Sequence, residues 1–173
     1  MSAKAVGTMA KKSEDKSRRR PANLPADVAT MTGGKKRRFD VELFIVHPTM
    51  EPAAITAALG LEPKIVHRVG DQRKTLKGTL LKGRHPDTRW RYSARYTVQD
   101  QSFVHELAKF VDYLIAYKAF LRELQATGGE ACVGVQFLGD GYFGDRIEPD
   151  TLAKLADLEV GFGIECYMVP QSP

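Results

Sequence analysis

Four segments of this chain alternate apolar and polar residues with a period of two, and this pattern constrains the fold more than any other feature of the sequence. In the first segment, Asp40 and Glu42 alternate with apolar residues such as Val41 and Leu43. Successive side chains of a β-strand point to opposite faces, so each segment predicts a strand that is buried on one face only. The four segments are about residues 39–47, 90–98, 131–137 and 160–168. They predict a sheet with one apolar face and one polar face.

Proline and acidic residues mark the start of two predicted helices. Glu51-Pro52 and Glu148-Pro149 each place proline in a first helical turn, beside a carboxylate that the positive end of the helix dipole favours. The twelve residues from Glu51 align weakly with the twelve from Glu148. Each half of the chain therefore has the pattern of a strand followed by a proline-started helix, which favours two related α/β halves.

A third, longer helix is predicted between the second and third strands. Apolar residues from Phe103 to Leu124 recur at alternating spacings of four and three, and the pattern ends at Gly128 and Gly129. One continuous helix from about Ser102 would be roughly 35 Å long and could lie across a whole sheet. Its wide apolar stripe favours packing on the sheet, and a coiled-coil dimer seam is the alternative.

These patterns predict an α+β fold. We expect a two-layer sandwich in which one four- to five-stranded mixed or antiparallel sheet carries about three helices on one face, with ferredoxin-like repeated βαβ halves. Trp90 lies on the apolar side of the second strand, so it is predicted in the core. Residues 64–89, which contain many Lys, Arg and Gly residues, predict loops and a small hairpin.

The charge of the chain is divided between two unlike parts. Residues 1–38 hold eleven basic residues against three acidic ones, a net charge of +8, whereas the remaining fifteen basic and eighteen acidic residues leave residues 39–173 at −3. The first part has almost no aromatic or β-branched residues and is predicted to be a disordered basic N-terminal arm. Residues 39–173 are predicted to form a single α+β domain. An arm of this charge is typical of proteins that contact a polyanion or an acidic partner.

Composition also indicates where the protein acts. The apolar stretches are shorter than the roughly 20 residues that a transmembrane helix requires, so no membrane contact is expected. Cys132 and Cys166 lie in separate predicted strands without the paired spacing of a zinc site, and we expect reduced thiols. These features predict a cytoplasmic protein.

Several motifs together resemble a known family. They are the run from Glu51 to Ile55, the sequence from Leu59 to Pro63, Gly70-Asp71 and, after a basic stretch, Trp90. The second half adds a strand, a loop, a helix and a final strand ending near Tyr167. This combination resembles the bacterial domain of unknown function family 4279 over nearly all of residues 39–170. The resemblance implies a small intracellular bacterial α+β domain with no catalytic residues to transfer. It also suggests a partner-binding or immunity-like role.

No motif of the sequence defines a reaction. The four histidines show no zinc-ligand spacing, so no metal and no cofactor are expected. His47 ends the first strand and is predicted to be a hydrogen-bonded edge histidine. The glycine-containing loop from Gly139 to Asp145 lacks the ligand spacing of a calcium loop and predicts a turn centred on Asp140 and Gly141. An enzyme using His47, His67 or Asp71 is the least favoured alternative, because no nucleophile, base and orienting group can be named together.

Two surfaces are candidates for binding. The first is the polar face of the sheet, which contains Ser93 and three glycines that indicate a flat docking surface. The second is the basic segment 64–91, with nine basic residues against two acidic ones. Either surface could instead be simply solvated. The candidate binding residues are Arg91, Arg95, Gln136, Glu165 and Tyr167 on the sheet and Arg68, Asp71, Arg73 and Lys74 in the basic segment.

The favoured hypothesis is a non-enzymatic binding module, immunity-like or regulatory, that engages a protein partner through the open sheet face and the basic loop. The alternative is a nucleic-acid-associated protein whose arm contacts phosphates. A monomer and a homodimer are both compatible with the sequence.

Overall fold

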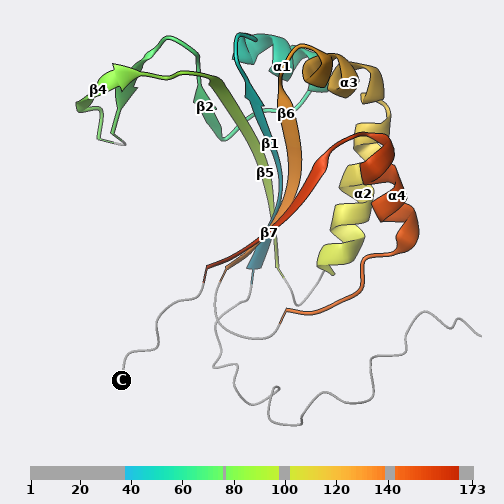
Figure 1. The fold of residues 1–173 in the computed structure, drawn as a ribbon. Coiled ribbons are helices and arrows are strands. Elements are labelled where there is room, and N and C mark those ends of the chain that lie inside the picture. The colour runs from blue at the N-terminus through green and yellow to red at the C-terminus, as the bar shows by residue number, and fades with distance from the viewer. Residues whose placement is uncertain (1–37, 76, 98–101, 139–142, 168–173) are drawn as a thin grey trace, which may run out of the picture.

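The computed structural model describes residues 38–75, 77–97, 102–138 and 143–167 of the chain. It contains seven strands and four helices within these residues (Figure 1). The strands are β1 Arg38–His47, β2 Ile65–His67, β3 Gln72–Lys74, β4 Leu80–Arg84, β5 Thr88–Thr97, β6 Glu130–Leu138 and β7 Gly161–Tyr167. The helices are α1 Pro52–Leu59, α2 Phe103–Ile115, α3 Lys118–Ala126 and α4 Pro149–Asp157.

Five of the strands form one mixed sheet in the order β2-β5-β1-β6-β7. All neighbours in this sheet are antiparallel except β6 and β7, which are parallel. Strands β3 and β4 form a separate two-stranded hairpin (Figure 1). The prediction of an α+β fold with a mixed sheet is confirmed. A ferredoxin-like repeat is not shown, because β1 and β5 of the first half pair antiparallel whereas β6 and β7 of the second half pair parallel.

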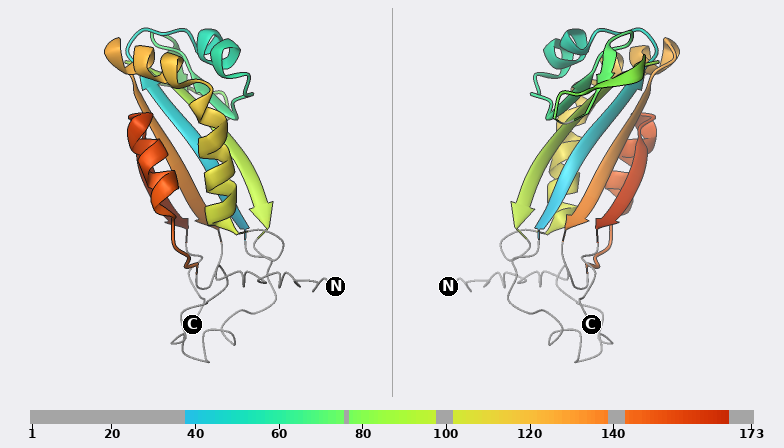
Figure 2. Two further views of the ribbon diagram at one scale, coloured as in Figure 1. Left: turned by 90° about the vertical axis from the view of Figure 1, so that its right-hand side faces the viewer. Right: turned by 90° about the vertical axis from the view of Figure 1, so that its left-hand side faces the viewer.

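The core lies between the sheet and the helices, which cover one face of it (Figure 2). The predicted alternation of β1 is confirmed: Val41, Leu43 and Ile45 are at most 1 % exposed and face the helices. From the helix side, Leu107 of α2 and Leu155 of α4 pack into the same cluster. Burial of large apolar side chains from both layers is the main stabilising contribution to such a fold.

The two proline-started helices begin where they were predicted. Pro52 and Pro149 occupy the first turns of α1 and α4, where a missing N–H costs no helical hydrogen bond. Gly60 ends α1 in the left-handed conformation at φ 64°, which glycine adopts without a steric penalty.

The predicted single long helix is wrong, because the chain breaks it into α2 and α3. No glycine or proline lies between Phe103 and Ala126. At the break, the N–H of Tyr117 bonds the carbonyl of Leu114, a tighter turn than an α-helix makes. Helix α2 packs on β1 whereas α3 packs on β6 and turns across the end of the sheet (Figures 1 and 2). The break lets Leu121 and Leu124 reach the core, where both are fully buried, and it raises the number of helices from the predicted three to four.

The basic segment is more regular than predicted. It contains the edge strand β2, which was not predicted, and the hairpin of β3 and β4, which was. Of the predicted arm, only Arg38 belongs to the described residues, and it is the first residue of β1. The remainder of the arm and the predicted turn at Asp140 and Gly141 lie outside the described residues.

Trp90 is fully buried, as predicted, and its indole N–H donates a hydrogen bond to Thr56 Oγ1 at 3.0 Å. This bond joins β5 to α1. Replacing Trp90 with alanine therefore removes a large core side chain and a bond between the two layers.

We expect Trp90→Ala to lower the free energy of unfolding by roughly 3 to 5 kcal/mol, because the cavity left by a large aromatic side chain is not refilled. Urea unfolding followed by far-ultraviolet circular dichroism measures the change. Trp90→Phe keeps most of the volume and loses only the hydrogen bond, so it should cost less. Equal stability of wild type and Trp90→Ala would contradict the burial.

Candidate binding surface

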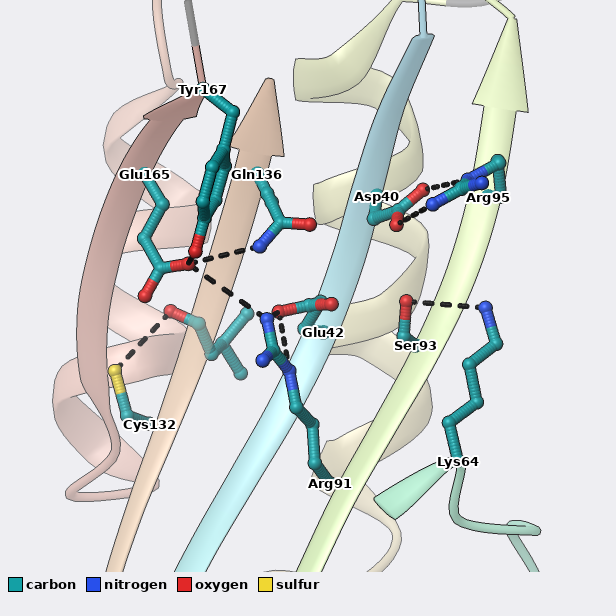
Figure 3. A network of polar contacts seen from close by, with 11 residues as sticks. Asp40, Glu42, Lys64, Arg91, Ser93, Arg95, Cys132, Gln136, Glu165 and Tyr167 are labelled. Carbon is teal, nitrogen blue, oxygen red and sulfur yellow. Dashed lines mark hydrogen bonds and ion pairs between the residues drawn. The ribbon is translucent and has the colours of Figure 1, made fainter. Parts of the chain in front are cut away.

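The sheet face opposite the helices, here called the open face, brings together five of the predicted residues: Arg91, Arg95, Gln136, Glu165 and Tyr167. They come from β5, β6 and β7. Four of them form one polar network with Glu42 of β1, and Arg95 forms a separate ion pair with Asp40 of β1 (Figure 3). A shallow hollow of about 280 Å³ is lined by four of them, all except Glu165. The prediction of a shared polar face therefore places these side chains correctly.

Asp40 and Arg95 form the first ion pair of this face. They are directly opposite each other on β1 and β5, and the guanidinium donates two hydrogen bonds to the carboxylate, at 2.8 and 2.9 Å. Asp40 is only 2 % exposed. The hydrogen bonds that Arg95 donates to Asp40, together with the negative charge of Asp40, raise the pKa of Arg95 above the ordinary arginine value. A buried carboxylate without such a partner destabilises the fold. The first role of Arg95 is therefore to stabilise the sheet.

Arg91 forms the second ion pair. It donates hydrogen bonds to the buried Glu42 of β1, and its Nη2 atom lies 3.8 Å from Glu165 Oε2. Glu165 in turn accepts hydrogen bonds from Gln136 at 3.0 Å and from the Tyr167 hydroxyl at 3.4 Å. The network thus extends from β5 across β1 and β6 to β7 (Figure 3). The two arginines already have carboxylate partners, so the open face offers little free positive charge to a ligand.

Four further polar residues line this surface and were not among the predicted site residues: Asp40, Glu42, Lys64 and Ser93. Ser93 was placed on this face but not counted as a site residue. For Asp40 and Glu42 the signal was present, because they alternate with the apolar residues of β1 and therefore share its polar face. Lys64 Nζ donates to Ser93 Oγ at 3.3 Å, and no pattern in the sequence indicates this contact.

The residues predicted in the basic segment do not join the network of the open face. Arg68 donates two hydrogen bonds to Glu51, at 2.6 and 2.8 Å, and lies 3.7 Å from Asp71. Arg73 and Lys74 lie on β3 of the hairpin and are exposed. The predicted site is therefore two surfaces, the open face and the hairpin, joined by the loop that holds Arg68.

Three glycines of the open face leave room above the sheet. A Cβ atom added at Gly134, Gly161 or Gly163 would meet no described atom closer than 3.6 Å, which is ordinary van der Waals contact. No close backbone approach among the described residues requires glycine there. These positions keep the face flat, and they accept a side chain without strain.

His47 is held as a structural residue. Its Nδ1 atom accepts hydrogen bonds from the N–H groups of Thr49 and Met50 at 3.1 and 2.8 Å, so Nε2 carries the proton and donates to Thr127 Oγ1 at 3.0 Å. A Cβ at Gly129 would lie 2.6 Å from this ring, so only glycine fits at this position. The prediction of a hydrogen-bonded histidine at the strand end is confirmed.

The structure brings two of the other histidines, His67 and His85, together. His67 stacks on His85 at a centroid distance of 4.4 Å, and burial lowers the pKa of His67. No cluster of three or more His, Cys, Asp or Glu residues capable of holding a metal ion occurs among the described residues. None of the helices described is both long and apolar enough to cross a bilayer.

The fold and this surface define a small α+β domain with a five-stranded mixed sheet, helices on one face and an exposed polar face. The model of the family DUF4279, a domain of unknown function, matches residues 37–169. The chain belongs to this family, as its motifs predicted. Comparisons with curated proteins and with solved structures found no match.

The buried, neutral His47 should make folding sensitive to acid. Burial lowers its pKa below the ordinary 6.5, so between pH 6.5 and the lower folded value the unfolded chain binds a proton that the native protein does not. The contribution of neutral His47 to the free energy of unfolding is therefore present in full above pH 6.5. It is lost as the pH falls from 6.5 to the folded pKa, with a slope of up to about 1.4 kcal/mol per pH unit.

Urea unfolding at a series of pH values measures this loss. His47→Asn should abolish this part of the pH dependence, because the amide oxygen can accept the two N–H groups without titrating. His105→Asn, at an exposed position on α2, is the matched control and should keep it. An unchanged pH profile in His47→Asn would contradict the neutral, buried state.

Proposed function

We propose that this protein is a non-enzymatic binding module that engages a protein partner with an acidic surface, through the hairpin of β3 and β4 and the adjoining open face. The observation that carries the proposal is the group of unpaired cations on the hairpin. Residues 72–84 contain five basic residues and no acidic one. The hairpin projects from the end of the sheet on the side of the open face (Figures 1 and 2).

The basic residues of the second half of the fold differ from those of the hairpin, although Lys64 of the first half also has no carboxylate partner among the described residues and donates to Ser93 instead. All five Lys and Arg residues in residues 102–138 and 143–167 make ion pairs with carboxylates: Lys109, Lys118, Arg122, Arg146 and Lys154. None of the five in the hairpin pairs with a carboxylate among the described residues. Arg84 alone of the five donates a side-chain hydrogen bond to a described residue, to the carbonyl of Gly70. Unpaired cations gathered on one projecting element attract an acidic surface and accelerate encounter with it.

Apolar side chains accompany these cations. Leu80 and Leu81 of β4 are 65 % and 39 % exposed, and Ile65 and Val66 of the adjoining β2 are 44 % and 43 % exposed. Interfaces between proteins combine apolar anchors with a charged rim, whereas a purely electrostatic contact with phosphate needs no exposed leucines. This combination favours a protein partner over a simple polyanion.

The open face supports this role as a rigid platform. Its arginines are neutralised by Asp40 and Glu42, and its glycines leave a flat area beside the exposed Phe44 and Tyr167. A partner bound at the hairpin would extend over this area without having to displace any of the described helices or strands. A catalytic role has no comparable support, because His47 uses both ring nitrogens in structural hydrogen bonds.

Charge reversal on the hairpin tests the proposal. Lys74→Glu combined with Lys82→Glu should weaken the complex by at least about a hundredfold, roughly 1.4 kcal/mol for each charge, because like charges then face each other. Arg146→Glu is the matched control: its side chain is 83 % exposed and pairs only at the surface, with Glu148. Affinity purification from native cells with the three proteins identifies the partner as the protein captured by wild type and control but lost with the hairpin variant. Titration of the purified partner then gives the affinities, and equal capture by all three proteins would refute the proposal.

The contribution of the open face needs a variant that leaves the ion pairs intact. Arg95→Glu is unsuitable, because it would leave the buried Asp40 beside a second carboxylate. Gly134→Arg is suitable, since a Cβ there meets nothing closer than a carbonyl oxygen at 3.9 Å. If Gly134→Arg keeps the wild-type free energy of unfolding but binds the partner more weakly, the open face belongs to the interface. If its affinity for the partner is unaltered, the interface is restricted to the hairpin.

A nucleic-acid partner is the second candidate, and the same unpaired cations favour it together with the charge of residues 1–38. The logarithm of the affinity for duplex DNA would then fall with the logarithm of salt concentration, with a slope of about 0.9 for each phosphate contacted. Reversing Lys74 and Lys82 should reduce that slope by roughly two. Fluorescence anisotropy of labelled duplex DNA at several salt concentrations measures it. Absence of binding at low salt would exclude this candidate and leave the protein partner.

A further inference from the structure

Strand β7 leaves one edge of the sheet open. It lies at the end of the strand order and pairs only with β6, in parallel. Every second residue of an edge strand points its N–H and C=O groups away from the sheet. No described residue bonds this outer edge of β7. The edge is therefore a template for one more strand.

Most of the usual protections against strand pairing are missing from β7. Natural edge strands are shielded by charged side chains, above all lysine, by proline, by bulges or by very short length. β7 is seven residues long, GFGIECY, with no lysine, arginine or proline, and its register with β6 is continuous. Its one charged residue, Glu165, accepts a hydrogen bond from Gln136 of the neighbouring β6. The opposite edge contrasts with it, because β2 is only three residues long and is followed by the basic segment. Ile164 and Tyr167 of β7 are 58 % and 55 % exposed, although Ile164 is on the side of the sheet that the helices cover elsewhere.

The sequence of β7 is complementary to itself in one arrangement. If two copies of β7 run antiparallel about a two-fold axis at Ile164, Tyr167 lies opposite Gly161 of the copy and Glu165 lies opposite Gly163. Each large side chain of the open face thus meets a glycine, and no two carboxylates oppose each other. On the helix side Ile164 lies opposite itself, and Phe162 opposite the exposed Cys166. Aromatic residues stabilise facing glycines in strands by covering the backbone, and like charges directly opposite would destabilise the pair.

We propose that β7 pairs in antiparallel orientation with β7 of a second copy of this chain, centred on Ile164. The pairing joins the two five-stranded sheets into one continuous sheet, and a two-fold axis of this kind closes the assembly at two copies. Ile164 and its copy become covered by each other. The hairpins lie away from the new contact, so this pairing is independent of the binding role proposed for them.

A substitution at the centre of the contact tests the dimer. Wild type should behave as a dimer in analytical ultracentrifugation at concentrations up to about 100 µM, well above the Kd of an ordinary specific interface. Ile164→Lys places two like charges opposite each other and should give a monomer with unaltered circular dichroism. Leu80→Lys is the matched control, since Leu80 is 65 % exposed on the hairpin, and it should remain dimeric. A monomeric wild type, a dimer in Ile164→Lys, or loss of the dimer in both variants would each overturn the proposal.

A cross-link tests the register. Directly opposite residues of an antiparallel pair have Cα atoms about 4.5 to 5.5 Å apart, within the range that a disulfide spans. In a chain with Cys132→Ser and Cys166→Ser, Ile164→Cys should form a disulfide-linked dimer on mild oxidation. Leu80→Cys in the same background should not. Equal cross-linking of both variants indicates random collision and overturns the register, as does the absence of cross-linking at position 164.

Discussion

The central strand β1 imposes the constraint on which the sheet depends. One of its faces buries Val41, Leu43 and Ile45 under the helices, while the other carries Asp40 and Glu42, which are 2 % and 8 % exposed. A carboxylate so little exposed destabilises the fold unless a cation pairs with it. Arg95 meets this requirement because the register of β1 and β5 places it directly opposite Asp40. A slip of one residue would expose the apolar set and separate the pair, so both interactions select the same register.

This arrangement also separates the basic residues that stabilise the sheet from those that are available to a partner. From the sequence alone, Arg91 and Arg95 of β5 were expected to offer positive charge to a ligand. In the structure both already form ion pairs with carboxylates of β1. The cations of the hairpin have no carboxylate partner within the part of the chain that the structure describes, and they lie beside exposed leucines. Binding is therefore expected at the projecting element, with the sheet as its support. The proposed pairing of β7 would add a second kind of contact, between copies, at the edge of the sheet opposite β2.

Much of the fold follows from short-range patterns. The alternation in β1, the proline starts of α1 and α4 and the position of Trp90 in the core are all confirmed. The face shared by Arg91, Arg95, Gln136, Glu165 and Tyr167 also follows from alternation, because pleating alone decides on which side of a strand a residue lies. What these patterns could not indicate was the partner of each charge. Whether Arg95 is free or paired depends on which strand lies beside β5, and that is a long-range pairing.

The sequence by itself thus determined the four long strands and the apolar side of each, the starts of α1 and α4, and the uneven distribution of charge. The tertiary structure decided the strand order, the parallel pairing of β6 with β7 and the break between α2 and α3. The break illustrates the physical reason: the spacing from Phe103 to Leu124 is helical throughout and contains no glycine or proline, so local propensity favours one helix. Only the requirement that Leu121 and Leu124 be buried at the end of the sheet, while Leu107 and Val111 are buried along it, turns the chain. Burial against distant residues outweighs a local preference of a few tenths of a kcal/mol per residue.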